Sequence, residues 1–166
     1  MQFSKRTKNI TVAATIAALY IALTMLSYAF GLDKGAIQLR LSEALAVLPA
    51  MSGAAVPGVF VGCLLSSLLC GGHPFDILFG SLVTLVAAFL CHSMRGALRF
   101  KFGALLFCLP NILLNAIFIP FLLIFVYGVP DAYPYLVLTV GIGEALTTGV
   151  LGTLLLFTVR RHAILK

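Results

Sequence analysis

Long apolar runs separated by short polar breaks constrain this chain more than any other feature. A helix needs about 20 mainly apolar residues to cross the hydrocarbon layer of a bilayer. Five runs approach that length and one apolar segment is shorter; the six lie at 10–30, 41–51, 54–71, 75–94, 103–127 and 135–159. Of the 166 residues, 61% are hydrophobic and only 10% are charged, which excludes an ordinary water-soluble domain. We therefore predict an all-α integral membrane protein that forms a single domain over residues 1–166.

The basic residues predict how often the chain crosses the membrane. Nine of the eleven form three clusters: Lys5, Arg6 and Lys8; Arg95, Arg99 and Lys101; Arg160, Arg161 and Lys166. Because clustered Lys and Arg mark the cytoplasmic side, both termini and the 95–101 connection are expected in the cytoplasm. This arrangement requires six transmembrane helices and makes 41–51 a short second one. Nucleic acid is not an expected partner, since the basic residues flank apolar runs and belong to no binding motif.

Six polar side chains within or beside the apolar runs are the candidate substrate-binding residues. A charge at the bilayer centre costs roughly 2.5–3.5 kcal/mol on insertion scales, so such residues are functional candidates by default. They are Gln38, Arg40, Glu43, Asn111, Asn115 and Glu144. Several have a structural alternative: Arg40 and Glu43, spaced i and i+3, could neutralise each other, and the two asparagines, spaced i and i+4, could join helices.

Glu144 lies in the stretch VGIGEALTTG, whose glycines allow a backbone or a ligand to approach closely. No basic residue is near it in sequence. Its hydrogen-bond donor is therefore either Arg40, brought close by the fold, or the N–H edge of a substrate. Asp76 and His73, at the start of the run 75–94, are interpreted as structural residues; a carboxylate there suits the N-terminus of a helix.

Catalytic machinery is not recognisable in the sequence. There is no Ser/His/Asp, Cys/His or metal-ligand spacing, and no phosphate-binding GxxxxGK[ST] stretch. The four cysteines stand singly in apolar runs, as small packing residues do. We therefore expect no enzyme activity, no cofactor and no metal.

The first apolar run carries a row of small residues. Ala14, Ala18 and Ala22 are spaced four apart in AATIAALYIALT, so they share one helix face. Such a row allows another helix to come close. It could seat the protein's own helices or dock a separate membrane subunit.

Five stretches together resemble the QueT-type queuosine-precursor transporters, which are substrate-binding S components of energy-coupling factor (ECF) transporters. The stretches follow the family's order and are IQLRLSEALAVLP (37–49), PGVFVGCLLSSLL (57–69), FDILFGSLVTLVAA (75–88), LPNILLNAIFI (109–119) and VGIGEALTTGVLG (140–152). The alanine row resembles the motif by which S components engage the transmembrane coupling subunit. The 32–36 stretch LDKGA departs from the more apolar or proline-containing loop expected of the family.

This resemblance implies an S-component-like bundle of six helices in the cell membrane, with a pocket that opens outward. It implies a 7-deazaguanine substrate, preQ1 or queuine, and three partner subunits: the coupling subunit and two ABC-type ATPases. The six candidate residues would bind the base, since a carboxylate can accept two adjacent N–H donors and an amide or guanidinium can donate to a carbonyl. Tyr20, Tyr28 or Phe79 could stack on it.

Other functions remain open from the sequence. A stand-alone secondary transporter would need a coupling-ion site. A small intramembrane enzyme would need a nucleophile and a base within reach of each other. A structural membrane protein would have no ligand pocket.

Overall fold

The computed structural model describes residues 4–32, 37–99 and 103–162, and within these ranges the secondary structure is entirely helical. The α-helices are α1 (Lys5–Ala29), α2 (Ala55–Leu69), α3 (Pro74–Ser93), α4 (Gly103–Phe125), α5 (Tyr133–Glu144) and α6 (Thr153–His162). Two segments are 3-10 helices, η1 (Leu41–Ala50) and η2 (Met94–Arg99), and one is a π-helix, η3 (Ala145–Gly152). Since η3 joins α5 directly to α6, the three form one continuous helix.

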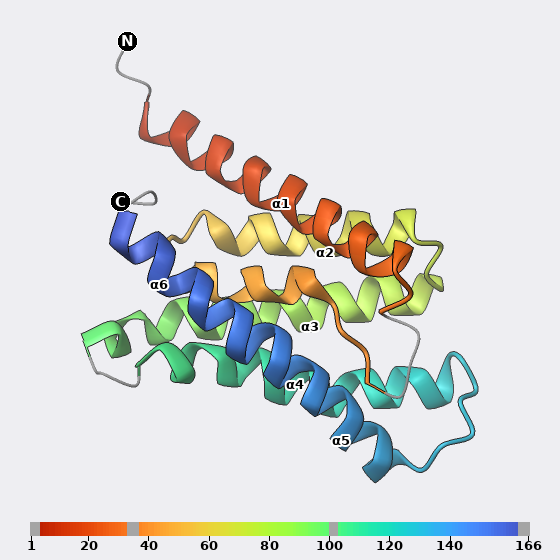
Figure 1. The fold of residues 1–166 in the computed structure, drawn as a ribbon. Coiled ribbons are helices and arrows are strands. Elements are labelled where there is room, and N and C mark those ends of the chain that lie inside the picture. Colours follow the sequence, from red (N-terminus) through yellow and green to blue (C-terminus); the bar gives the residue numbers. More distant parts are fainter. Residues whose placement is uncertain (1–3, 33–36, 100–102, 163–166) are drawn as a thin grey trace.

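The helices run side by side along the bundle and alternate in direction (Figure 1). The N-terminus, the C-terminal end of α6 and η2 lie at one end of the bundle. The connections that follow α1, α2 and α4 lie at the opposite end. The described members of the three basic clusters therefore gather at one end; Lys101 and Lys166 lie outside the described residues, as does most of the 32–36 stretch.

The prediction of an all-α membrane protein is confirmed, whereas in the described part of the chain only four helices have membrane-spanning length. These four apolar helices are Lys5–Ala29, Pro74–Gly96, Gly103–Phe125 and Tyr133–Arg161. The predicted helices at 41–51 and 54–71 form as the shorter apolar helices Leu41–Ala50 and Ala55–Leu69. The 41–51 segment is short because the chain enters it through an extended segment, and Pro49 lies within its last turn.

Helix η1 forms the centre of the bundle. It contacts α1, α2, α3, α4, η3 and α6, and every residue from Ser42 to Ala50 is buried. A 3-10 helix is thinner than an α-helix, and from Ala44 to Ala50 this one is apolar on all sides, so it can be buried completely. The short apolar segment of the sequence is therefore the core element.

Large apolar side chains cover the outside of the bundle, while polar ones are buried within it. Phe89, Phe125 and Leu138 are more than 60% exposed, whereas Glu43 and Asn111 are only 2% exposed. An apolar exterior is stable against lipid chains, and buried polar groups then bond to one another. This distribution suits a protein surrounded by lipid.

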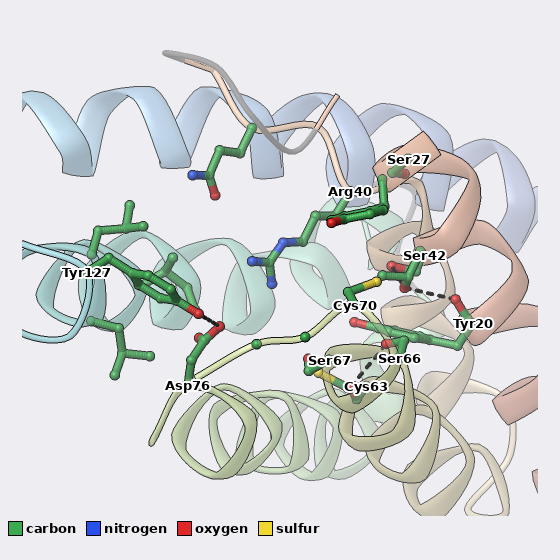
Figure 2. Close-up of a pocket in the computed structure, with 18 of the residues that line it drawn as sticks. Tyr20, Ser27, Arg40, Ser42, Cys63, Ser66, Ser67, Cys70, Asp76 and Tyr127 are labelled. Carbon is green, nitrogen blue, oxygen red and sulfur yellow. Dashed lines mark hydrogen bonds between the residues drawn. The ribbon is translucent and has the colours of Figure 1, made fainter. Parts of the chain in front are cut away.

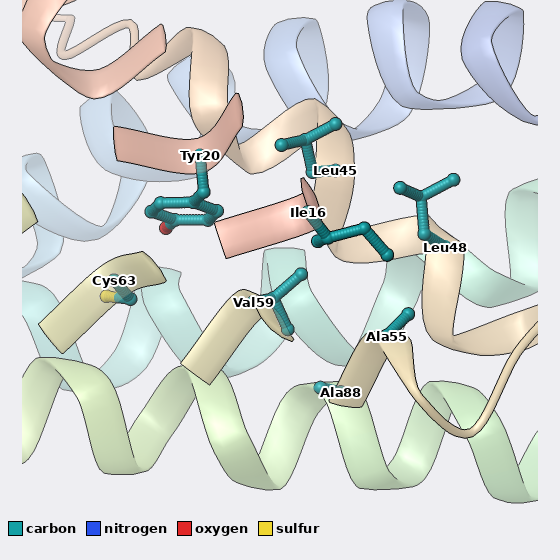
Figure 3. Packing of buried hydrophobic residues seen from close by; sticks show 8 residues of the cluster. All are labelled: Ile16, Tyr20, Leu45, Leu48, Ala55, Val59, Cys63 and Ala88. Carbon is teal, nitrogen blue, oxygen red and sulfur yellow. The ribbon is translucent and has the colours of Figure 1, made fainter. Parts of the chain in front are cut away.

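Helices α1 and α2 pack closely through glycines. A Cβ atom on Gly58 would lie 2.8 Å from the carbonyl oxygen of Ala13, and one on Gly62 would lie 2.6 Å from Cβ of Tyr20. The adjoining core cluster brings Ile16 and Tyr20 of α1 against η1, α2 and α3 (Figure 3). These contacts use a face of α1 other than the alanine row, since Ala14, Ala18 and Ala22 are all exposed.

Candidate functional site

An extended segment before η1 begins the site. Arg40 has extended backbone angles (φ −98°, ψ 100°) and precedes the first residue of η1. The segment packs so tightly on α5 that a Cβ atom on Gly143 would lie 2.1 Å from the carbonyl oxygen of Gln38. Only glycine, which lacks a Cβ atom, allows this approach. The glycines around Glu144 thus admit a backbone segment, and that segment carries Gln38 and Arg40.

A cavity of about 460 Å³ opens beside this segment, at the end of the bundle away from the termini. The Arg40 side chain extends into it, with Tyr127 and Asp76 on one side and Ser42 and Cys63 on the other (Figure 2). The lining is rich in hydroxyl and charged groups and includes Tyr20, Thr24, Ser27, Tyr28, Gln38, Arg40, Ser42, Ser66, Ser67, Asp76 and Tyr127. Such a cavity suits a polar solute.

Tyr127 joins two connections at the mouth of the cavity. Its hydroxyl donates to Oδ2 of Asp76 at 2.8 Å and accepts from the backbone N–H of His73 at 3.2 Å. Burial raises the pKa of the Tyr127 hydroxyl, and its bond to Asp76 acts in the same direction, so the phenol remains a donor. The side chain that caps α3 is His73, which accepts from the N–H of Phe75. Asp76 lies in the first turn, as predicted, but its carboxylate also faces the cavity.

A buried polar cluster lies beneath the cavity and joins five helical elements, α1, η1, α4, α5 and η3. Glu43 of η1 accepts through Oε1 from the hydroxyl of Tyr20 in α1, and through Oε2 from Nδ2 of Asn111 in α4 at 2.9 Å. Glu144 at the end of α5 accepts through Oε2 from Nδ2 of Asn111 at 3.0 Å, and through Oε1 from Nδ2 of Asn115 at 3.1 Å. One asparagine amide thus bridges two buried carboxylates.

Thr148 of η3 completes this cluster. Its hydroxyl oxygen lies 2.9 Å from Nδ2 of Asn111, 3.0 Å from Oε2 of Glu144 and 3.2 Å from the backbone oxygen of Glu43. Oδ1 of Asn111 is buried and has no hydrogen-bond partner among the described residues. The amide turns its Nδ2 toward Glu43, Glu144 and Thr148.

A small recess is lined by residues of both the cavity and the buried cluster. Its volume is about 10 Å³, and its polar lining comes from Gln38, Arg40, Asn115 and Glu144. Gln38 and Arg40 also line the large cavity. The structure therefore brings all six predicted residues into one region: two between the cavity and the recess, two at the floor of the recess, and Glu43 and Asn111 hydrogen-bonded behind it.

The structure corrects one interpretation of Arg40. Arg40 and Glu43 do not neutralise each other on one helix face, because Arg40 is in the extended segment and only Glu43 is in η1. Asp76 and Glu43 both attract the guanidinium electrostatically. Within the described part of the chain, however, no carboxylate comes within 4.0 Å of it. The guanidinium is thus held without a direct ion pair to those carboxylates.

Tyr20 and Thr148 have roles that the sequence reasoning missed. Tyr20, considered for stacking on a base, is 2% exposed and donates its hydroxyl to Glu43. Phe79, also considered for stacking, is half exposed and lines an apolar groove between α3 and α4. Thr148 follows Glu144 by four residues, and this helical spacing could have predicted that the two side chains lie on one helix face.

Metal-ligating groups do not gather in the described part of the chain: no three His, Cys, Asp or Glu residues are placed together to hold an ion. The site consists of carboxylates, amides, hydroxyls and one guanidinium. Such groups can form hydrogen bonds with a polar ligand and can orient it.

Comparison with known proteins identifies the family. No curated protein and no solved structure matches the chain. The family model described as "QueT transporter" matches residues 10–161, which is nearly the whole chain. Together with the four long apolar helices, this match indicates a multi-pass membrane transporter. The chain belongs to the QueT transporter family.

Proposed function

We propose that the chain is the substrate-specificity subunit of an ECF importer and binds a queuosine precursor, the 7-deazaguanine base preQ1 or queuine. It takes the base from outside the cell and delivers it inward when coupled to partner ATPases. Membership of the QueT transporter family supports a queuosine precursor as substrate. The observation that carries the proposal is the convergence of Gln38, Arg40, Asn115 and Glu144 below a polar cavity.

The proposed topology has six membrane crossings and both termini in the cytoplasm of a cell-membrane protein. The basic end of the bundle, which holds the termini and η2, supports this orientation. Ten residues of 3-10 helix extend about 20 Å, and the extended segment 37–40 adds about 13 Å. The two pieces together reach across a hydrocarbon core of about 30 Å. The cavity then opens at the outer surface.

The proposed recognition uses the donor and acceptor pattern of a guanine-like base. Its adjacent N–H and NH₂ groups need acceptors, which the two oxygens of Glu144 supply, and its carbonyl needs a donor, which Arg40, Gln38 or Asn115 supplies. If the substrate is preQ1, its aminomethyl cation also favours a site with two carboxylates and one arginine. The cavity volume, about 460 Å³, lies in the range of small-molecule pockets.

The proposed partners are the ECF transmembrane coupling subunit and two ABC-type ATPase subunits, with lipid around the bundle. The exposed row of Ala14, Ala18 and Ala22 supports this part of the proposal, because the protein's own α1–α2 contact uses Ala13, Tyr20 and the glycines of α2. Small exposed side chains let a partner helix come close.

The test is a binding titration of the purified chain with preQ1, queuine, guanine and an unrelated vitamin, followed by thermal unfolding. The true ligand should raise the melting temperature, with a stabilisation of about RT ln(1 + [L]/Kd). Arg40→Met should weaken this response, whereas the matched control Arg95→Met, at the opposite end of the bundle, should keep it. Equal and non-saturating responses to all four compounds would exclude the proposed substrate class.

A stand-alone secondary transporter is the second candidate, and the buried Glu43–Glu144 pair favours it. Carboxylates inside a bundle are typical of proton-coupled transport. Uptake of the labelled substrate by cells that lack the coupling subunit and its ATPases distinguishes the two functions. The ECF proposal expects no uptake in those cells.

A further inference from the structure

The hydrogen atoms available in the buried cluster are too few if both carboxylates are ionised. Oγ1 of Thr148 lies within hydrogen-bonding distance of Oε2 of Glu144 at 3.0 Å and of the backbone oxygen of Glu43 at 3.2 Å. Both are oxygen-to-oxygen contacts, and each is a hydrogen bond only if a hydrogen lies between the two atoms. The threonine hydroxyl has only one hydrogen to offer. One contact therefore lacks a hydrogen.

Asn111 does not supply the missing hydrogen. Its Nδ2 carries two hydrogens and lies near three acceptors: Oε2 of Glu43 at 2.9 Å, Oε2 of Glu144 at 3.0 Å and Oγ1 of Thr148 at 2.9 Å. Even if both hydrogens of Nδ2 are used, the contact to which Thr148 does not donate still has no hydrogen between its two oxygens. One additional proton between Thr148 and Glu144 would supply the hydrogen that this pair of oxygens lacks.

The charges around the cluster also indicate that the cluster lacks one proton if both carboxylates are ionised. Glu43 and Glu144 bind the same amide nitrogen and are 2% and 7% exposed. Two carboxylates that share a buried site resist ionising together. The charged groups that act on Glu144 are Glu43 and Arg40, both from the segment that ends in η1. Among the described residues, α4 and η3 present only the neutral Asn111, Asn115 and Thr148 to it.

We propose that Glu144 carries a proton in the empty site while Glu43 is ionised. The protonated Oε2 of Glu144 donates to Oγ1 of Thr148, and Thr148 donates to the backbone oxygen of Glu43. Asn111 donates one hydrogen to Thr148 and the other to Oε2 of Glu43. Asn115 donates to Oε1 of Glu144, which is the carbonyl oxygen of the acid. In this arrangement both contacts of the Thr148 hydroxyl oxygen with other oxygens have a hydrogen, and Nδ2 of Asn111 lies 3.0 Å from Oε2 of Glu144 without donating to it.

Glu43 is the ionised member because its donors and its environment suit an anion. Its two carboxylate oxygens accept from the hydroxyl of Tyr20 and from the amide of Asn111. Arg40, three residues earlier in the chain, adds an attractive positive charge. The hydroxyl of Tyr20 has a hydrogen of its own to donate to Oε1 of Glu43, so this contact needs no added proton.

Ligand binding should release this proton, an expectation that rests on the proposed function. A ligand edge with two N–H donors needs both oxygens of Glu144 as acceptors, so its binding displaces the proton. Calorimetric titration with preQ1 in buffers of different ionisation enthalpy should show the release of about one proton per ligand bound. Binding without proton release would overturn the displacement, whereas no binding at all would count against the proposed function instead.

Infrared spectroscopy of the empty protein tests the proton without any ligand. At neutral pH the wild-type protein should show the C=O stretching band of a buried protonated carboxylic acid, and Glu144→Gln should lose it. The control Asp131→Asn, in the exposed connection before α5, should keep the band. Absence of the band from the wild type, or its persistence in Glu144→Gln, would overturn the assignment.

A second variant keeps the test valid if Glu144→Gln does not fold. Asn115→Leu removes the hydrogen bond to Oε1 of Glu144 and leaves Glu43 untouched. A carbonyl that loses a donor stretches at higher frequency, so the acid band should move upward in this variant. An unmoved band would assign the proton to another group and overturn the proposal.

Discussion

At the scale of single residues, the hydroxyl of Tyr20 is the side-chain donor to Oε1 of the buried Glu43. Tyr20→Phe keeps the ring in the α1–α2 interface but leaves a buried carboxylate oxygen without this donor. An unsatisfied buried group costs about 1–3 kcal/mol, so thermal or denaturant unfolding in detergent should show a loss of that size. The exposed Tyr135 provides the control: Tyr135→Phe should leave the stability of the protein unchanged. Equal stability of the two variants would show that the Tyr20 hydroxyl does not stabilise the buried cluster.

Glu144→Gln is the residue-scale change that affects the ligand. It keeps the size of the side chain but replaces one acceptor oxygen with an NH₂ group, which would face the donors of a guanine-like edge. A hydrogen bond to a charged group contributes about 1.5–3 kcal/mol, and 1.4 kcal/mol corresponds to a tenfold change in affinity. The Kd for the ligand should therefore rise at least about tenfold while the empty protein stays folded. A destabilised variant with unchanged affinity would make Glu144 a purely structural residue.

At the scale of elements, the contact between α5 and the extended segment 37–40 positions the site. Gly143→Ala would place Cβ 2.1 Å from the carbonyl oxygen of Gln38, which must then move together with Arg40. Overpacking of this kind costs about 1–3 kcal/mol, and ligand affinity should fall with stability. The matched control is Gly141→Ala on the same helix, because its Cβ would meet that of Ala116 at an ordinary 3.6 Å. Similar behaviour of the two variants would contradict the tight contact.

The exposed face of α1 is the second element with a prediction. Replacement of Ala18 and Ala22 by leucine should block the close approach of a partner helix, while the cavity at the other side of α1 keeps its shape. Ligand binding should survive and uptake should be lost, as measured by titration alongside co-purification with the coupling subunit. Leu19→Phe adds bulk on α1 outside the row and serves as the control. Normal uptake by the double variant would show that the row faces only lipid.

At the scale of the whole molecule, the orientation of the bundle is open to chemical labelling. In a Cys70→Ser background, cysteines at Ser4 and Asp131 lie at opposite ends, and both positions are exposed. A membrane-impermeant maleimide added to intact cells should label position 131 and should label position 4 only after permeabilisation. The reverse pattern would invert the proposed topology and place the cavity in the cytoplasm.

The sequence by itself determined the all-helical membrane class, the approximate limits of the apolar helices and six of the polar residues that gather at the site. These features were accessible because hydropathy and helical length are local properties that add along the chain. The family resemblance was readable for the same reason, and the family match over residues 10–161 confirms it.

Only the tertiary structure decided how the site residues are paired. Asn111 bridges Glu43 and Glu144 across 68 and 33 residues of chain, and no local pattern encodes such distances. Arg40 does not share a helix face with Glu43, because the chain is extended up to the start of η1 at Leu41 and packs there against Gly143. Helices η1 and η3 depart from the α-helical period at the point where they pack together, and packing overrides local preference there. Tyr20 and Thr148 joined the cluster because a buried carboxylate must take its donors from whichever helices surround it.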